Sequence, residues 1–227
     1  MTTSQTLSRG LHALEFIALA DAAPSIEGVA EHLGVHRSVA YRIVRTLEDH
    51  HLVDRDAAGA CQPGVRLAAL GRFARPTLQS IALQELAQLA NDLALTCFLV
   101  VRDGDEALTL ESLEPTTSQF HITYKPGIRH PIDQGAPGIA ILAGDPHRPD
   151  ERAEVTTARS QGWATTTGEV VPGSTAIAVP IPGVDASIAT VFFQGAELDK
   201  RLVVDQLGAT ATTIAKHIDR SRPVAAS

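Results

Sequence analysis

Hydrophobic positions in the first 35 residues recur at the spacing of two short helices. Apolar residues at positions 7, 11, 14, 17 and 18 predict a helix over 5–20, which Pro24 ends. A second apolar set, at 26, 29, 30 and 33, follows Ser25, a residue type suited to cap a helix, and stops at Gly34. The pattern therefore predicts two helices, the second of which ends in a tight turn at this glycine.

The next stretch predicts a third helix and a hairpin. The helix is expected from about 37 to 50, and residues 52–64 then have the composition of two short strands around a tight turn. A short helical stretch at 67–73 leads to a boundary at Arg75-Pro76. Three helices and a hairpin within this span form one compact unit.

After this boundary the pattern is typical of strands enclosed by helices, and Asp103-Gly104 is a pair that favours a hairpin turn. The expected elements, in order, are a helix at 78–93, strands at 96–102, 106–113 and 118–124, a short apolar helix at 139–144, strands at 163–167, 175–181 and 186–195, and a helix at 199–219. Between the short helix and the fourth strand lies a polar segment rich in Pro, Asp and Arg. This order predicts an α+β domain with an antiparallel sheet flanked by helices.

Length and composition fit two domains of ordinary size. The chain has 227 residues, of which 44% are hydrophobic and only 4% aromatic, so aliphatic side chains must build the cores. We place a first domain at 1–65, a linker helix at 66–75 and a second domain at 76–222.

Cysteine usage and the absence of targeting signals indicate the compartment. Cys61 and Cys97 show no CxxC or Cys/His ligand spacing, so two free thiols in a reducing compartment are expected. Neither a signal peptide nor an apolar run of about 18 residues occurs, so we expect a cytoplasmic protein without a membrane partner.

Charge divides the chain unevenly. The formal net charge is −7, yet residues 1–75 hold eight Arg, no Lys and eight acidic residues, so the whole acid excess lies after residue 75. Different charge in the two parts suggests different partners, and binding to DNA depends on the local potential of the contacting face.

The third helix separates into an apolar and a basic face. At about 100° per residue, the apolar face holds Val39, Ala40, Ile43, Val44 and Leu47. The other holds Arg37, Ser38, Tyr41, Arg42 and Arg45. Any surface helix could show such a division. A helix ending at glycine, a turn and a second helix with polar first residues is nevertheless the helix-turn-helix arrangement, whose second helix lies in the major groove.

Guanidinium groups suit phosphates and guanine edges, and hydroxyls suit phosphates, so this face is a candidate DNA reader. The hairpin behind the helix, with Arg55 expected at its tip, would form a wing that touches the DNA backbone or the minor groove. Arg9 is assigned either to a phosphate or to packing of the first helix.

Six segments carry a family resemblance. The first three are "QTLSRGLHALEFIA", "SIEGVAEHLGVHRSVAYRIVRTLEDHHLVDRD" and "QPGVRLAALGR", which resemble the winged helix-turn-helix domain of IclR-family bacterial transcriptional regulators. The others are "GIRHPIDQGAPGIAILA", "QGWATTTGEVVPGSTAIAVPI" and "TVFFQG", which resemble the family's GAF-like effector-binding domain. The resemblance implies a repressor or activator of a catabolic or metabolic operon. It would be controlled by a small molecule and would bind a palindromic operator in double-stranded DNA as a homodimer or tetramer.

The resemblance also implies an effector pocket. In the family an effector carboxylate meets backbone amides in the segment matching "DQGAPG", a polar side chain at Thr166, and small hydroxyl residues at the positions of Phe192 and Gln194. This chain departs from the pattern because Pro137 lacks an N–H and Phe192 is bulky. The segment 144–162 is also shorter than usual. These departures favour an aromatic or more apolar effector.

The expected pocket residues lie on strands and loops of the second domain. They are Leu99, Ile132, Gly135, Ala136, Trp163, Thr166, Ala176, Thr190, Phe192 and Gln194. A pocket filled by its own Phe192 and Trp163, with no ligand, is the alternative.

Other chemistry is poorly supported. Histidines 121, 130 and 147 with Asp133 and Asp145 match no ligand spacing, so no metal and no cofactor are expected. No GxSxG, P-loop or dinucleotide motif occurs, and Ser174 has no evident base, so we expect no catalysis. A winged helix that binds another protein, and an enzyme built on the GAF-like fold, remain the competing hypotheses.

Overall fold

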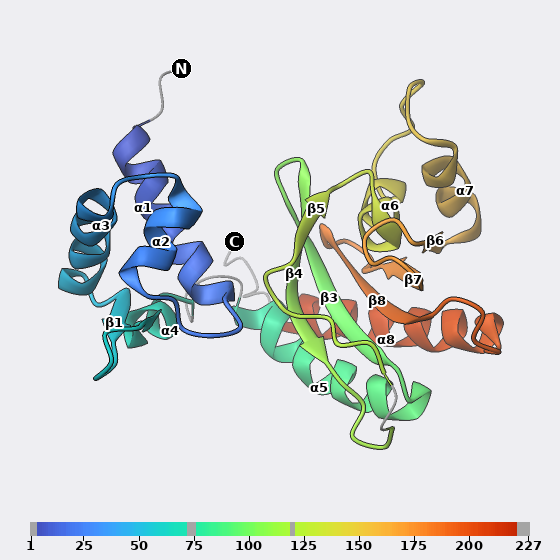
Figure 1. Ribbon diagram of the computed structural model, residues 1–227. Coiled ribbons are helices and arrows are strands. Elements are labelled where there is room, and N and C mark those ends of the chain that lie inside the picture. The colour runs from blue at the N-terminus through green and yellow to red at the C-terminus, as the bar shows by residue number, and fades with distance from the viewer. Residues whose placement is uncertain (1–3, 72–75, 119–120, 222–227) are drawn as a thin grey trace, which may run out of the picture. The chain divides into compact units, whose positions relative to one another are not determined.

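The structure is a computed structural model that describes residues 4–71, 76–118 and 121–221. The chain divides into two compact units, residues 1–76 and 77–227 (Figure 1). The expected linker helix at 66–75 falls partly on helix α4 (Val65–Gly71), whereas residues 72–75 lie outside the described residues. The domain limits 1–65 and 76–222 stay predictions.

Three helices pack together in the first unit: α1 (Gln5–Leu19), α2 (Ile26–Leu33) and α3 (Arg37–Asp49). The Ser25 hydroxyl accepts the Gly28 N–H at 3.2 Å and so begins α2. Gly34 ends it with a φ of 60°, a conformation that costs glycine little. The apolar faces of the three helices meet in one core, so the helix-turn-helix predicted from periodicity is confirmed.

A hairpin of β1 (Val53–Arg55) and β2 (Cys61–Pro63) completes this unit. The Asp56 carboxylate accepts the N–H groups of Ala58 and Ala60, both at 2.9 Å, and thereby fixes the turn between the strands. The Cys61 N–H donates to the Pro24 carbonyl at 2.8 Å and ties the hairpin to the helical core.

The second unit is built on a six-stranded antiparallel sheet in the order β5-β4-β3-β8-β7-β6. Its strands are β3 (Thr96–Asp103), β4 (Glu106–Leu113), β5 (Arg129–Pro131), β6 (Ala164–Thr167), β7 (Ser174–Pro180) and β8 (Ala186–Phe193). The central strands are apolar on both sides, as a sheet covered on both faces requires. The expected α+β class is therefore confirmed.

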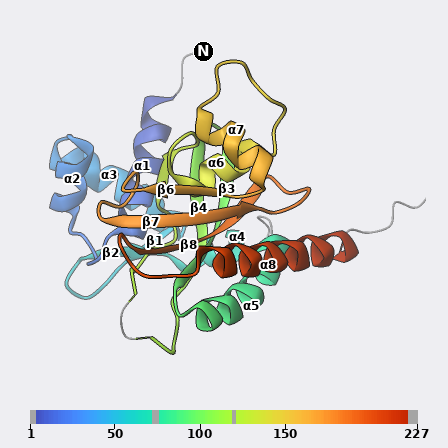
Figure 2. The ribbon, with the colours of Figure 1, turned by 90° about the vertical axis from the view of Figure 1, so that its right-hand side faces the viewer.

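Helices cover both faces of this sheet. Figure 2 shows α5 (Pro76–Leu93) and α8 (Lys200–Ser221) together on one face, with α6 (Gly135–Ala143) and α7 (Ala153–Gln161) on the other. Along β3, Cys97, Leu99 and Val101 pack toward α5 and α8. Phe98 and Val100 pack in the core that contains α6. Alternation along the strands thus makes two separate apolar layers.

The structure corrects two sequence expectations. Residues 118–124 were expected as a strand, but residue 118 and residues 121–124 are not in strand conformation. The segment packs through side chains instead, because Tyr124 is buried and stacks on Phe98 at 4.3 Å between ring centroids. The strand that pairs with β4 at this edge of the sheet is β5. Helix α7 lies in the polar segment where no helix was expected. Only Val155 and Ala158 are buried in it, and two apolar positions are too few to show a helical period in the sequence.

Candidate DNA-binding surface and ligand pocket

Helix α3 turns its basic face to solvent. Ala40, Ile43, Val44 and Leu47 are buried, while Ser38, Tyr41, Arg42 and Arg45 are exposed. The His36 ring nitrogen accepts the Ser38 N–H at 3.3 Å and begins the helix. The division predicted from the helical wheel therefore has its physical cause in the packing of α3 on α1 and α2.

The three arginines of this face differ in their partners. Arg37 lies 2.8 Å from Glu27, and Arg45 lies 3.4 Å from Asp49. All four side chains of these pairs are more than half exposed, so each pair contributes little to stability and can be exchanged for another anion. The Arg42 guanidinium forms no ion pair within the described part of the chain, which leaves it free for a phosphate or a base edge.

Arg55 has a different position from the one expected. It lies in β1 rather than at the hairpin tip, and it donates two hydrogen bonds to Glu48, at 2.6 and 2.9 Å. Its guanidinium also lies over the Tyr41 ring, 5.9 Å from the centroid. The hydrogen bond to Glu48 raises the pKa of Arg55. Arg55 therefore holds the hairpin against α3, and its expected place at the tip is corrected.

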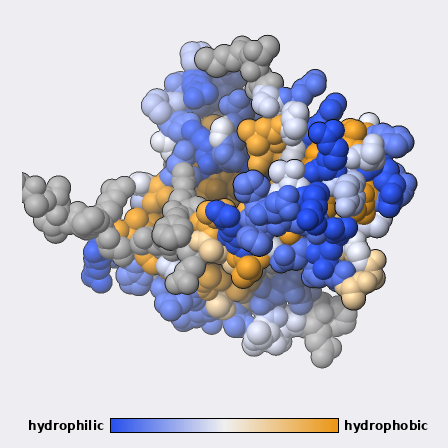
Figure 3. Space-filling view, turned by 90° about the vertical axis from the view of Figure 1, so that its left-hand side faces the viewer, coloured by the Kyte–Doolittle hydropathy of each residue, from blue (hydrophilic) through white to orange (hydrophobic). Residues whose placement is uncertain are grey.

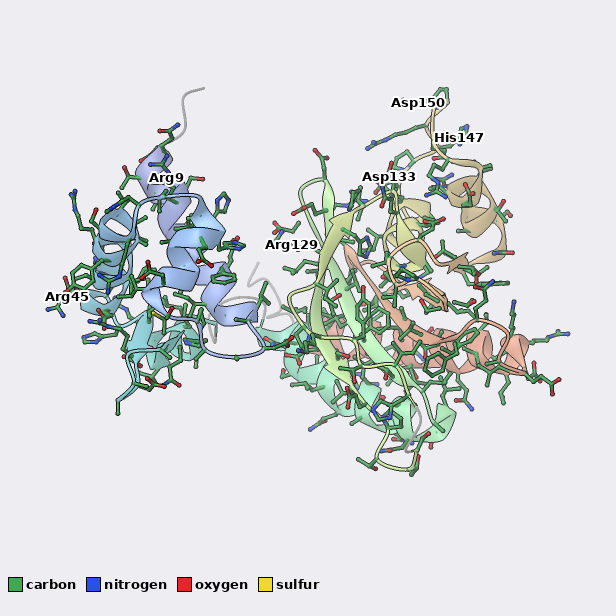
Figure 4. The ribbon with its side chains drawn as sticks, in the orientation of Figure 1. Arg9, Arg45, Arg129, Asp133, His147 and Asp150 are labelled. Atoms are coloured by element: carbon green, nitrogen blue, oxygen red, sulfur yellow. The ribbon has the colours of Figure 1, made fainter. Side chains whose placement is uncertain are left out.

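Figure 4 shows Arg45 pointing outward from α3, whereas Arg9 lies on α1 and not on the α3 face. Arg9 is exposed. On the side of the molecule seen in Figure 3, hydrophilic residues cover most of the surface and apolar residues form separate patches between them.

A small cavity lies between the sheet and the N-terminus of α6. Its volume is about 20 Å³, roughly the room for one water molecule. Its walls come from strands, from the start of α6 and from the 168–173 loop between β6 and β7. The lining residues are Phe98, Tyr124, Gly135, Ala136, Pro137, Thr166, Gly168, Glu169, Val170, Val171, Ser174, Ala176 and Val191.

Backbone donors at the start of α6 are already engaged within the unit. The Gly135 N–H donates to the Glu169 carboxylate at 2.8 Å, and the Ala136 N–H donates to the Thr166 hydroxyl at 2.9 Å. Arg152 donates to both Glu169 oxygens, at 3.0 and 3.2 Å. These contacts, led by that of Arg152, hold the pKa of Glu169 below its usual value.

Four expected pocket residues line this cavity: Gly135, Ala136, Thr166 and Ala176. The structure places four others elsewhere. Leu99 and Phe192 lie in the core on the opposite face of the sheet, and Trp163 packs against that core. Thr190 is paired with Cys97 on the same face, and its hydroxyl donates to the Thr96 carbonyl at 2.9 Å.

The expectation that these four share the pocket is therefore corrected. The reason is the two-residue period of the strand, which sends Val191 toward α6 and its neighbours Thr190 and Phe192 away from it. Ile132 lines a second hollow. Gln194 is exposed beyond the end of β8, and its backbone N–H donates to the Gly173 carbonyl.

Sequence reasoning missed the 168–173 loop. Glu169, Val170 and Val171 come from a stretch without periodicity, so no local pattern indicates that they close a pocket. The sequence does not show which alternate positions of β3 and β8 point toward α6, so it could not indicate Phe98 and Val191.

The second hollow, of about 390 Å³, is lined mainly by charged residues. Asp145 pairs with Arg102 at 2.9 Å, and Arg159 bonds to both oxygens of Glu151. The hydrogen bonds from Arg159 hold the pKa of Glu151 far below its usual range.

The histidines and carboxylates considered as metal ligands include several on the loops around α6 and α7. Figure 4 shows Asp133, His147 and Asp150 on the segments around α6 and α7. Nowhere in residues 4–71, 76–118 or 121–221 do three or more potential metal ligands come together. The same residues contain no helix that is both long and apolar enough to cross a bilayer. Ser174 donates its hydroxyl to the Val171 carbonyl at 2.7 Å.

Comparison with known proteins relates the helix-turn-helix part of the chain to a family model. Residues 6–57 match the model of the IclR helix-turn-helix domain. The chain is 27% identical over 138 residues to the "Probable transcriptional regulator SauR" of Cupriavidus necator, an alignment that covers 60% of this chain and 54% of that protein. The chain spans about half the length of the curated relatives it matches.

Solved structures resemble the whole chain. An IclR transcriptional regulator from Alicyclobacillus acidocaldarius matches with a TM-score of 0.79 and 23% identity, over 95% of this chain and 99% of that one. An IclR homologue from Microbacterium hydrocarbonoxydans, complexed with 4-hydroxybenzoate, also gives a TM-score of 0.79, at 20% identity, over 96% of this chain and all of that one. At this identity the likeness shows the fold. Residues 6–57 match the IclR helix-turn-helix domain, and the chain as a whole has the fold of solved IclR regulators.

Proposed function

We propose that this protein is a transcriptional regulator that binds double-stranded DNA through α3 and responds to a small molecule bound in its second unit. The observation that carries the proposal is the α3 face, where Arg42, without an ion pair among the described residues, lies beside Ser38, Tyr41 and two weakly paired arginines. The named function of the relatives as transcriptional regulators supports it.

We assign different roles to the basic residues according to their contacts. Arg37, Ser38, Tyr41, Arg42 and Arg45 are the proposed contacts to the major groove and its phosphates. Arg55 positions Tyr41 and the hairpin rather than binding DNA itself, because its guanidinium is engaged by Glu48. Arg9, on α1, is a candidate phosphate contact outside the groove.

Two copies of such a helix would be needed for useful affinity. One face offers only a few cations, and residues 1–75 carry no net charge, so nonspecific attraction to DNA is small. A homodimer that binds a palindromic operator doubles the contacts and matches half-sites about one helical turn apart.

The second unit is the proposed effector domain. An IclR homologue of the same fold is complexed with 4-hydroxybenzoate, which supports a small aromatic acid as the kind of ligand. The cavity beside α6, with Phe98, Tyr124 and Val191 as apolar walls, is the proposed site.

Binding to the promoter fragment upstream of the protein's own gene tests the DNA-binding function. The full chain should shift this duplex in a gel at low salt and release it as salt rises, since phosphate contacts release counterions. A variant with Arg37, Arg42 and Arg45 changed to Ala should lose the shift. Absence of retention at any salt would contradict the proposal and favour a protein-binding role for the winged helix.

The effector role has a separate test. Thermal-shift screening of small aromatic and aliphatic acids should find a compound that raises the melting temperature of the wild type. The same compound should lose this effect in Thr166→Val, which removes a polar group of the cavity wall. If no acid stabilises the protein, the effector proposal fails while the DNA-binding result stands.

A further inference from the structure

We propose that His36 recognises a guanine in each half-site of the operator through an N–H donor that the start of α3 holds in a fixed direction. The donor is the Nε2–H group of the imidazole ring, and the acceptors are O6 and N7 on the major-groove edge of the base. This inference rests on the proposed DNA-binding function. It adds a residue that determines sequence preference, which contacts to phosphates do not provide.

The three helices of the first unit begin at different kinds of residue. Ser4 begins α1 and Ser25 begins α2, and each accepts a backbone N–H with its hydroxyl. Helix α3 begins at His36, whose Nδ1 accepts the Ser38 N–H at 3.3 Å. Small polar residues such as serine, threonine, asparagine and aspartate usually cap a helix, because a cap needs only one acceptor. The imidazole of His36 brings a second nitrogen that capping does not use.

The cap decides which ring nitrogen carries the proton. A backbone N–H only donates, so the Nδ1 that accepts it presents a lone pair, and the proton of the neutral ring is then on Nε2. The Ser38 hydroxyl lies 2.9 Å from the same Nδ1 and fits this tautomer, because a hydroxyl can donate. Nε2 of His36 is therefore a hydrogen-bond donor.

The same contacts hold the ring in one direction. Both join Nδ1 to Ser38, so the imidazole lies beside a residue of the exposed face of α3. His36 is itself exposed, and Nε2 forms no hydrogen bond within residues 4–71, 76–118 and 121–221. A donor that is already oriented loses little side-chain entropy when it binds. The start of α3 thus presents an oriented donor without a partner in the described chain.

The place of His36 in the helix-turn-helix favours a base edge over a phosphate. His36 directly precedes Arg37, the first residue of α3, and the first residues of a recognition helix are those that contact base edges in the major groove. Guanine presents two acceptors there and no donor. Cytosine presents an amino donor, adenine places one beside its N7, and thymine places a methyl group beside its O4. A single donor at this position therefore favours guanine.

Selection of binding sites by the full chain tests this inference. Wild type and His36→Ser each bind a pool of duplexes with a randomised centre, and the bound duplexes are sequenced. Serine keeps a cap of the kind that begins α1 and α2, but it removes the ring. Wild type should enrich guanine at one position in each half-site. His36→Ser should lose this preference and keep the preferences at the other positions.

Fluorescence anisotropy gives the size of the effect. The duplex that wild type selects is compared with duplexes that carry the other base pairs at the guanine position. Wild type should bind the selected duplex about 2- to 12-fold more tightly for each half-site, which is the range of one hydrogen bond. His36→Ser should bind all of these duplexes with similar affinity, because the side chain that distinguishes them is gone.

Two other variants separate the ring from the cap. His12→Ala removes another exposed imidazole from the first unit and should keep the guanine preference. His36→Ala removes both ring and cap, so it should lose the preference and also melt at a lower temperature than His36→Ser. His36→Thr, which also has a capping hydroxyl, takes the place of His36→Ser if the serine variant does not fold.

Two results would overturn the inference. One is the absence of any guanine preference that depends on His36. The other is an equal loss of affinity for every sequence in His36→Ser, which would mean that the ring binds a phosphate. A wild type that selects no duplex at any salt concentration would overturn the proposed DNA-binding function as well. A wild type that selects duplexes supports that function whatever His36→Ser does, so the two failures are distinguishable.

Discussion

Replacing Arg42 by alanine should weaken DNA binding without changing the stability of the protein. The side chain is exposed and has no ion-pair partner in the described residues, and α3 is anchored by buried residues on its other face. Alanine is also the strongest helix former. We therefore expect the free energy of unfolding to change by less than about 0.5 kcal/mol.

The effect on DNA binding should be much larger. An arginine that binds a phosphate or a guanine edge contributes roughly 1–3 kcal/mol, which corresponds to about 5- to 150-fold in affinity for each copy of the helix. A twofold-symmetric dimer is affected at both of its helices. The slope of log K against log salt should also become shallower by about one for each phosphate that the variant no longer binds.

Fluorescence anisotropy of a labelled promoter duplex across a sodium chloride series measures both quantities. Arg201→Ala, which removes the same charge from an exposed position on α8, is the matched control and should leave affinity unchanged. Arg42→Lys keeps the charge and should preserve the slope, but it loses a bidentate hydrogen bond if Arg42 reads a guanine. Equal affinity and slope in wild type and Arg42→Ala would refute the assignment of α3 as the reading helix.

Three further predictions concern the second unit. Gly138→Ala should destabilise this unit by roughly 1–3 kcal/mol in urea unfolding, because the new Cβ would lie 2.1 Å from the Ile132 carbonyl oxygen. The control Gly208→Ala, with no described neighbour within 4 Å of the new Cβ, should be neutral or stabilising. Burial raises the pKa of Cys97 to about 12, so iodoacetamide at pH 8 should label it only after unfolding; labelling in the native state would contradict this burial. The partners of Glu151 lower its pKa, so the stability that this carboxylate adds at neutral pH should be lost as the pH falls below 4.5. Glu151→Gln should make the free energy of unfolding less dependent on pH in this range. The same pH dependence in wild type and variant would show that the carboxylate is not responsible.

Several local features could be predicted from the sequence because neighbouring residues determine them. Ser25 and Gly34 begin and end α2 through their own side-chain chemistry and backbone freedom. The period of α3 separates Arg42 from Val44 whatever the rest of the chain does, so the face proposed to bind DNA follows from the residues themselves.

The ligand pocket could be predicted only in part. Gly135 and Ala136 were expected in the pocket because the segment "DQGAPG" resembles the family's effector site, but β8 is apolar at most positions and is buried on both faces. Its two polar residues, Ser187 and Thr190, are both buried and point to opposite faces, so they do not show which face meets which helix layer. The sequence therefore could not decide between Val191 and Phe192, and the packing of α6 against one face decided it.

By itself the sequence determined the helix-turn-helix, the order of most elements and the α+β class, because these depend on periodicity and capping within short stretches. Only the tertiary structure placed Arg55 on Glu48 and Glu169 on the start of α6. The second contact joins residues 34 positions apart, through a loop without a pattern of its own. Its physical reason is the meeting of a helix N-terminus, a guanidinium and a carboxylate in space, which no local pattern of residues encodes.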